Sequence, residues 1–180
     1  MKRKARRLQY AGVIVLLLFA VLYTKEEITL AGNESSRFGV IQALGEQGVF
    51  HIERTNFAST VDRVEWNGHV YSDKPLPLSS AAVVHGTVHR LTGINFSENR
   101  MLAIYLINLL FSGGCNILLF LWMFRLLRRT CRGRIEVKWL LALAMCLSTW
   151  LLTYSVIFNN HTPAALAVLG LVIALEKYRR

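Results

Sequence analysis

The chain has 180 residues, of which 53% are hydrophobic, and its 21 Lys and Arg residues against 11 Asp and Glu give a net charge of +10. The charged fraction of 18% lies below the roughly 25% that is usual in soluble domains, so the composition excludes most soluble classes. The basic excess does not indicate nucleic-acid binding, because no segment combines a basic stripe with stacking aromatic residues. Cys115, Cys131 and Cys146 show neither the spacing of a disulfide framework nor a C-x-x-C zinc motif.

Four apolar stretches are candidates for membrane-spanning helices. They are Leu8 to Tyr23, Met101 to Phe124, Trp139 to Phe158 and Pro163 to Leu175. A span needs about 20 residues, so the second and third stretches are long enough. The first is shorter and can span only if its flanking Lys and Arg side chains reach up to the headgroup region. The fourth is shorter still. We therefore predict an all-α polytopic membrane protein with about four transmembrane helices.

The distribution of Lys and Arg predicts the orientation. Residues 1–7 hold five basic and no acidic residues, residues 24–100 hold seven basic and nine acidic, and residues 125–138 hold six basic and one acidic. The positive-inside rule then places both termini and the 125–138 loop in the cytoplasm. Residues 1–24 are interpreted as basic N-terminus and first span, 25–100 as an external loop, and 101–180 as the remaining spans of a plasma (inner) membrane protein.

A cleaved signal peptide is the alternative for the N-terminus. Its basic start and apolar centre fit, but Lys25-Glu26-Glu27 follow where a small-x-small cleavage site belongs, and Thr29-Leu30-Ala31 resembles such a site only weakly. An uncleaved anchor is therefore favoured.

The first part of the external loop predicts an amphipathic helix. Asn33 to Ser36 offer helix caps, and Phe38, Ile41 and Leu44 follow at nearly helical spacing. We expect this helix to end near Gly45 or Gly48 and to lie along the bilayer surface.

The second part predicts a small β-hairpin and another surface helix. Asn67-Gly68, flanked by residues of high strand propensity, indicates a type I′ turn within Val64 to Tyr71. An extended segment through Pro75 and Pro77 follows, and Ser79 or Ser80 is expected to cap a helix that runs towards Leu91 and ends at Gly93.

Two pairs of charged residues in this loop are candidates for chemistry. Glu34 lies three residues before Arg37 at the start of the first surface helix, where the helix dipole also favours a simple capping acid. Asp73 and Lys74 are an adjacent acid and base, interpreted either as a solvated turn or as a phosphate-binding pair.

His85 and His89 are four residues apart on the second surface helix, a spacing that can present two imidazoles to one divalent metal ion. The alternative is that both are polar-face residues. His161 lies in a short turn between the last two expected spans and is either a loop residue or part of an external site.

Taken in order, these segments resemble the N-terminal portion of polytopic GT-C glycosyltransferases, in particular the aminoarabinose-transferase-like and mannosyltransferase-like group. Such enzymes carry an acid-x-x-Arg-aromatic motif on a surface helix, which Glu34-Ser35-Ser36-Arg37-Phe38 matches with Glu in place of Asp. They continue with an acid-Lys-Pro-Pro segment, which Asp73-Lys74-Pro75-Leu76-Pro77 matches with one Leu between the prolines.

The resemblance implies transfer of a sugar from a polyprenyl-phosphate donor to an acceptor at the external face. In that reaction Glu34 is the catalytic acid or base, and Arg37, Asp73 and Lys74 form the donor-phosphate site. Such enzymes have many more spans, so a C-terminal portion beyond these 180 residues is expected to complete the donor pocket.

Two alternatives remain open. The first is that the chain is a non-catalytic four-span protein whose external loop binds a ligand or partner. A transporter is less favoured, because Met101 to Phe124 and Trp139 to Phe158 contain no Asp, Glu, Lys or Arg.

Overall fold

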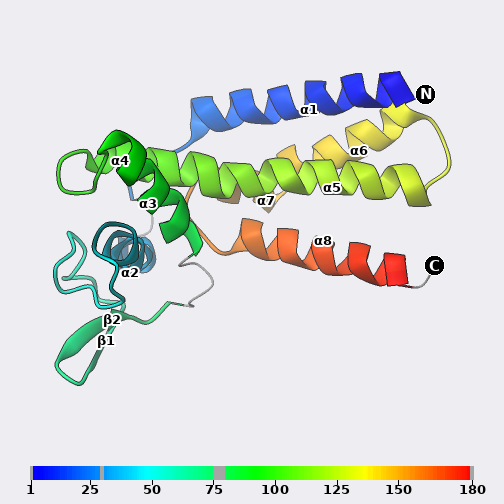
Figure 1. The fold of residues 1–180 in the computed structure, drawn as a ribbon. Coiled ribbons are helices and arrows are strands. Elements are labelled where there is room, and N and C mark those ends of the chain that lie inside the picture. The colour runs from blue at the N-terminus through cyan, green and yellow to red at the C-terminus, as the bar shows by residue number, and fades with distance from the viewer. Residues whose placement is uncertain (1, 29–30, 75–79, 179–180) are drawn as a thin grey trace. The chain divides into compact units, whose positions relative to one another are not determined.

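The computed structural model describes residues 2–28, 31–74 and 80–178. The described residues are mostly helical and include a two-stranded antiparallel sheet (Figure 1). The chain divides into two compact units. Residues 1–24 and 112–180 form one, called the helical unit, and residues 25–111 form the other, called the loop unit. The loop unit contains the expected external loop and continues past Arg100 to Phe111.

The helical unit is built around α5 (Gly114–Thr130). The other members are α1 (Lys2–Tyr23), α6 (Ile135–Leu147), α7 (Trp150–Ser155) and α8 (His161–Tyr178). Figure 1 shows α5 between α1 and α8, and α6 also packs against it. The buried core consists of Leu16, Leu119, Phe120, Phe124, Ala142, Cys146 and Leu169.

A glycine allows α1 to approach α5 closely. A Cβ atom built on Gly12 would lie 2.1 Å from Cζ of Phe120, a ring that is fully buried. Any larger residue at position 12 must therefore push the two helices apart or displace the ring.

Two helices in the described part of the chain are long and apolar enough to cross a membrane. They are Arg3–Tyr23 and Arg100–Thr130, and the second joins α4 (Arg100–Ile107), η3 (Asn108–Gly113) and α5 into one run. They contain the first two of the four expected spans. Only 22% of the apolar window of the first helix and 44% of that of the second are buried inside the chain.

The third expected span, Trp139 to Phe158, is not a single helix in the structure. The helix breaks at Ser148 and Thr149, between α6 and α7. The Thr149 hydroxyl accepts a hydrogen bond from the N–H of Leu151, 3.2 Å away, and donates one to the carbonyl of Met145. Threonine at such a position competes for backbone groups and caps a new helix, which apolar content alone does not predict. The fourth stretch lies within α8, which has 18 residues.

The loop unit begins with α2 (Ala31–Gln42), continued by one π-helical turn, η1 (Ala43–Gln47), and ended by Gly48 with a φ of 72°. This confirms the predicted end of the helix. The apolar face, however, does not lie free for a bilayer. Phe38 is 1% exposed, and its ring packs 5.9 Å from Phe57 and 5.8 Å from Phe96, measured between centroids. The expected surface helix is therefore the centre of a small aromatic core.

The predicted hairpin and second helix are both present. Strands β1 (Arg63–Trp66) and β2 (His69–Ser72) are joined by Asn67 and Gly68, whose φ angles of 50° and 79° are the positive values that a type I′ turn requires. Helix α3 (Ser80–Thr92) ends at Gly93, as expected. Pro75, Pro77 and Ser79 lie outside the described residues.

Candidate functional site

The hairpin brings two carboxylates together at its open end. Its register pairs Trp66 with His69 and Arg63 with Ser72. Asp62 and Asp73 are the next residues on the two strands and therefore lie side by side. Lys74 completes the arrangement, since its Nζ lies 2.9 Å from Oδ2 of Asp62 and 3.0 Å from Oδ1 of Asp73.

Lys74 is held as a cation by this pairing. Its side chain is only 15% exposed, and burial lowers the pKa of the ammonium group. The hydrogen bonds to Asp62 and Asp73 outweigh burial, so the pKa of Lys74 lies above its usual value. Asp62 was not among the residues singled out in the sequence, although the Asn67-Gly68 turn fixes its partner across the hairpin.

Helix α2 is fastened to the same end of the hairpin through Ser36. This residue is fully buried, and its hydroxyl lies 2.6 Å from the hydroxyl of Ser72. It also donates to the carbonyl oxygen of Asp62, and its Oγ lies 3.5 Å from Oδ1 of Asp73. Ser36 therefore joins the described parts of the two motif segments, Glu34 to Phe38 and Asp73 to Lys74.

This docking places Arg37 near Glu34 and near the two hairpin carboxylates. Glu34 lies in the first turn of α2 and is 2% exposed. Burial lowers the pKa of Arg37, and attraction to Glu34, Asp62 and Asp73 opposes that effect. The Nε atom of Arg37 is buried and has no hydrogen-bond partner among the described residues. The cluster thus consists of three carboxylates (Glu34, Asp62 and Asp73) and two cations (Arg37 and Lys74), and the Nε–H group of Arg37 is a buried donor with no partner in the described part of the chain.

A pocket of 360 Å³ lies in the same unit, beside the first turn of α2. Its lining residues are Gly32, Ser35, Asn56, Phe57, Ser59, Thr60, Val61 and Arg100. The Arg100 guanidinium stacks 5.0 Å from the Phe57 ring, a geometry that attracts the cation to the ring face. The pocket therefore combines hydroxyl groups with the guanidinium group of Arg100. One of the hydroxyl-bearing residues is Ser35, the neighbour of Glu34 in the sequence.

One ring nitrogen of His85 and one of His89 have hydrogen-bond partners within the loop unit. His85 is 1% exposed, and its Nε2 lies 2.9 Å from Oε1 of Glu46. The Nδ1 atom of His89 donates to the carbonyl of Ile94. The two rings stack at 6.3 Å. His85 is therefore a buried histidine with a carboxylate partner, and not the polar-face residue expected as the alternative.

Glu46 connects His85 to the core of the loop unit. The same Oε1 accepts a hydrogen bond from the backbone N–H of Phe96 at 2.8 Å, and Oε2 accepts one from Gln42 at 3.1 Å. Burial raises the pKa of Glu46, but the hydrogen bonds from His85, Phe96 and Gln42 outweigh it and hold the pKa below its usual value. A close crossing of η1 and α3 makes this possible, because a Cβ on Gly86 would lie 3.1 Å from the carbonyl oxygen of Gly45.

A second group of titratable residues, His51, Glu53 and His69, was missed in the sequence. Glu53 Oε2 lies 2.7 Å from Nδ1 of His51, and Oε1 lies 2.8 Å from Nδ1 of His69. Burial raises the pKa of Glu53, but hydrogen bonds from backbone N–H groups and from both histidines lower it to about 2. The available signal was the His-x-Glu spacing of His51 and Glu53, but nothing local links it to position 69.

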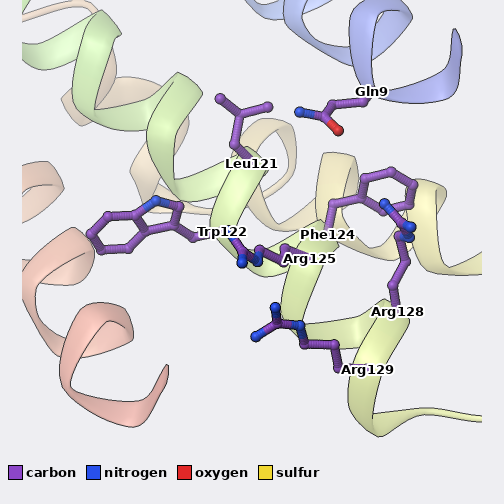
Figure 2. A pocket seen from close by; sticks show the side chains of 7 residues that line it. All are labelled: Gln9, Leu121, Trp122, Phe124, Arg125, Arg128 and Arg129. Carbon is purple, nitrogen blue, oxygen red and sulfur yellow. The ribbon is translucent and has the colours of Figure 1, made fainter. Parts of the chain in front are cut away.

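The helical unit has a basic hollow of 520 Å³ at the end of α5. Figure 2 shows Arg125, Arg128 and Arg129 around it, together with Gln9 from α1. The Arg128 guanidinium lies 5.8 Å from the centroid of Phe124. The arrangement gathers positive charge from the last turns of α5 at one end of the helical unit.

Comparisons with protein-family models, with curated proteins and with solved structures found no match to this chain. A function is therefore inferred from the residues and their geometry.

Proposed function

We propose that the chain is the N-terminal membrane portion of a GT-C-type glycosyltransferase, which moves a sugar from a polyprenyl-phosphate donor to an acceptor on the external face. The observation that carries the proposal is the joining of the two motif segments at Ser36. Glu34, Arg37 and Lys74 come from segments almost forty residues apart and belong to one partly buried charged cluster.

A membrane location is supported by the surface of the helical unit. The apolar side chains of α1 are largely uncovered, and Leu18 and Leu22 are 57% and 74% exposed. A soluble protein would bury such a helix in its core, whereas lipid covers it without cost. The basic residues of the hollow at the end of α5 suit the cytoplasmic headgroup region, which agrees with the orientation expected from the charge distribution.

The chemistry that we assign to the cluster has two parts. Glu34 accepts the proton of the acceptor hydroxyl as that oxygen bonds to C1 of the sugar. The bond between C1 and the phosphate oxygen breaks, and the polyprenyl phosphate leaves as an anion. Arg37 donates its unpartnered Nε–H to this phosphate, because a buried donor contributes most where negative charge develops.

Lys74 can bind the donor phosphate only if it gives up one of its present partners. Both of its close partners are carboxylates, so a phosphate oxygen must replace Asp62 or Asp73 at the ammonium group. We therefore assign Arg37 the first contact with the donor and Lys74 the second.

The test is sugar transfer by the full gene product in membranes, measured with a radiolabelled polyprenyl-phosphate sugar. Glu34→Gln removes the base but keeps the size of the side chain, and should lower the rate by about 10²–10⁴-fold. Glu65→Gln is the matched control, because Glu65 lies on the hairpin with its side chain 71% exposed, and should leave the rate unchanged. Full activity of Glu34→Gln, with normal insertion, would overturn the assignment.

A second candidate, a non-catalytic membrane protein whose loop unit binds a ligand or partner, is favoured by one observation. Lys74 is already neutralised by two carboxylates, as in a cluster that only stabilises its fold. Under this candidate the wild-type protein does not bind a polyprenyl phosphate, and Arg37→Lys changes nothing that native mass spectrometry with that lipid detects. Under the glycosyltransferase proposal the wild type binds the lipid, and Arg37→Lys weakens the complex.

A further inference from the structure

The group formed by His51, Glu53 and His69 lies in the loop unit and plays no part in the proposed transfer. One nitrogen or oxygen atom from each of the three residues lies within 4.8 Å of the other two. His51 is 27% exposed, Glu53 29% and His69 50%, all measured for the side chain. The three side chains are thus fixed near one another but open to solvent on one side.

Local structure explains why the three side chains converge. Ile52 lies between His51 and Glu53, is fully buried, and donates its backbone N–H to the carbonyl of Val70 at 2.8 Å. This hydrogen bond joins the segment before the hairpin to strand β2, which His69 begins. His51 and Glu53, on either side of Ile52, both contact His69, the first by ring stacking and the second through its carboxylate.

The arrangement is held by further contacts outside the ligand atoms. The rings of His51 and His69 stack with their centroids 4.8 Å apart and an interplanar angle of 25°. The backbone N–H of Val70 donates to Oε1 of Glu53 at 3.1 Å. Such a hydrogen bond orients a ligating carboxylate in metal sites, because it fixes which oxygen lone pair points at the ion.

We propose that His51, Glu53 and His69 bind one divalent transition-metal ion of the zinc class through two imidazole nitrogens and one carboxylate oxygen. Two His and one Glu are a common zinc ligand set, in which water takes the fourth position. Imidazole ligands exclude Mg²⁺ and Ca²⁺, which prefer oxygen. The bound ion fastens the segment around Ile52 to the hairpin.

The distances are compatible with an ion after a small adjustment. Ligand atoms at about 2.1 Å from a tetrahedral zinc ion are roughly 3.4 Å apart. The histidine nitrogen that lies 2.7 or 2.8 Å from the ligating carboxylate oxygen must therefore move away by roughly 0.6 Å, and the remaining ligand atoms, which lie within 4.8 Å of one another, must adjust to the same spacing. Rotation of the partly exposed side chains supplies both movements. The ion takes the place of the protons that now bridge the nitrogens and the carboxylate.

The experiment is zinc binding to the full chain, purified in mild detergent without a histidine tag. The five histidines of the sequence provide the matched controls. We expect one zinc ion per chain by equilibrium dialysis and elemental analysis, and unchanged binding in His161→Ala and His89→Ala. His51→Ala and His69→Ala should each weaken binding by more than about tenfold, since even residues that only orient a ligand contribute 10–100-fold.

A ligand replacement separates binding from folding. His69 is half exposed, so His69→Cys should fold normally and keep a metal ligand at this place. With Co²⁺ as the probe, His69→Cys should retain binding and gain the near-ultraviolet absorption of a thiolate–cobalt bond, whereas His161→Cys should not. Zinc binding by His51→Ala and His69→Ala equal to that of the wild type, or no zinc binding by the wild type, would overturn the proposal. Neither result bears on the transfer assay of Glu34.

Discussion

The first helices of the loop unit and the helical unit differ in what covers their apolar faces. In the loop unit, Phe38 of α2 is 1% exposed and packs against Phe57 and Phe96. In the helical unit, Leu18 and Leu22 of α1 are more than half exposed. The apolar face of α2 is thus covered by its own unit, while much of the apolar face of α1 is left exposed.

Buried polar groups do not divide between the two units in the same way. In the loop unit the Gln42 amide joins Glu46 to Asn56, with hydrogen bonds of 3.1 Å and 3.0 Å. Buried polar atoms with no hydrogen-bond partner among the described residues occur in both units, and they include Asn116 Oδ1 and Trp139 Nε1 in the helical unit, and Arg37 Nε and Asn108 Oδ1 in the loop unit. Each such group costs free energy. The comparison teaches that the exposed apolar face of α1, rather than the pairing of polar groups, distinguishes the helical unit.

The largest expected effect is on the aromatic core of the loop unit. Phe38→Ala removes a fully buried ring that contacts Phe57 and Phe96, and should destabilise this unit by about 3–5 kcal/mol. Hydrogen exchange of the segment 31–47 in the full chain measures the loss of protection. Leu18→Ala is the control in the helical unit, where the side chain is 57% exposed. Equal effects of the two changes would remove the contrast between the units.

The next effect concerns the contact between α1 and α5. Gly12→Leu introduces a side chain where even a Cβ would lie 2.1 Å from Phe120, and should destabilise the helical unit by about 1–3 kcal/mol through overpacking. Chemical unfolding in detergent measures this. Gly114→Ala is the matched change, since a Cβ there meets nothing within 4 Å. A destabilisation by Gly114→Ala as large as that by Gly12→Leu would contradict the close approach.

Elements with local signals were predictable from the sequence. The end of the first helix of the loop unit, the hairpin turn and the end of α3 all follow from glycines, and Gly48, Gly68 and Gly93 indeed have positive φ. Interactions that depend on distant packing were not predictable. Periodicity identified the apolar face around Phe38, but only the fold shows that Phe96 rather than lipid covers it.

The candidate site was predictable in part for the same reason. Glu34, Arg37, Asp73 and Lys74 were found by their motifs, and Asp62 was available from the hairpin register but was overlooked. His69 reaches Glu53 because the carbonyl of Val70 bonds to Ile52, a pairing that no local pattern encodes. The helix break at Thr149 could not be predicted for a different reason. It depends on the hydrogen bonds of one hydroxyl group, which a count of apolar residues does not detect.

A smaller effect is expected on the stability of the loop unit at low pH, through the carboxylate of Glu46. The pKa of Glu46 lies below its ordinary value of 4.5 in the folded chain, so its charge stabilises the fold above that pH. This stabilisation is lost as pH falls through the lower, folded pKa. Glu46→Gln should cost about 1 kcal/mol at neutral pH and flatten the acid dependence below pH 4.5. Hydrogen exchange of the segment 80–92 across this pH range is the measurement.

Glu65→Gln serves as the control for this acid dependence, because the Glu65 side chain is 71% exposed. It should leave the pH profile of the loop unit unchanged. An acid profile of Glu46→Gln identical to that of the wild type would show that the bonds to His85 and Phe96 contribute nothing to stability.

The smallest effect should come from the ion pair between Lys4 of α1 and Glu136 of α6. Their side chains are 61% and 32% exposed, and pairs of this kind contribute about 0–1 kcal/mol because water and salt screen them. Lys4→Ala should therefore shift the thermal midpoint of the helical unit only slightly, and the shift should vanish at high salt. A large shift that persists in salt would mean that the pair is shielded from water. Part of the stability of the helical unit would then come from charge pairing as well as from apolar packing. In that respect it would resemble the loop unit, in which Lys74 pairs with two carboxylates.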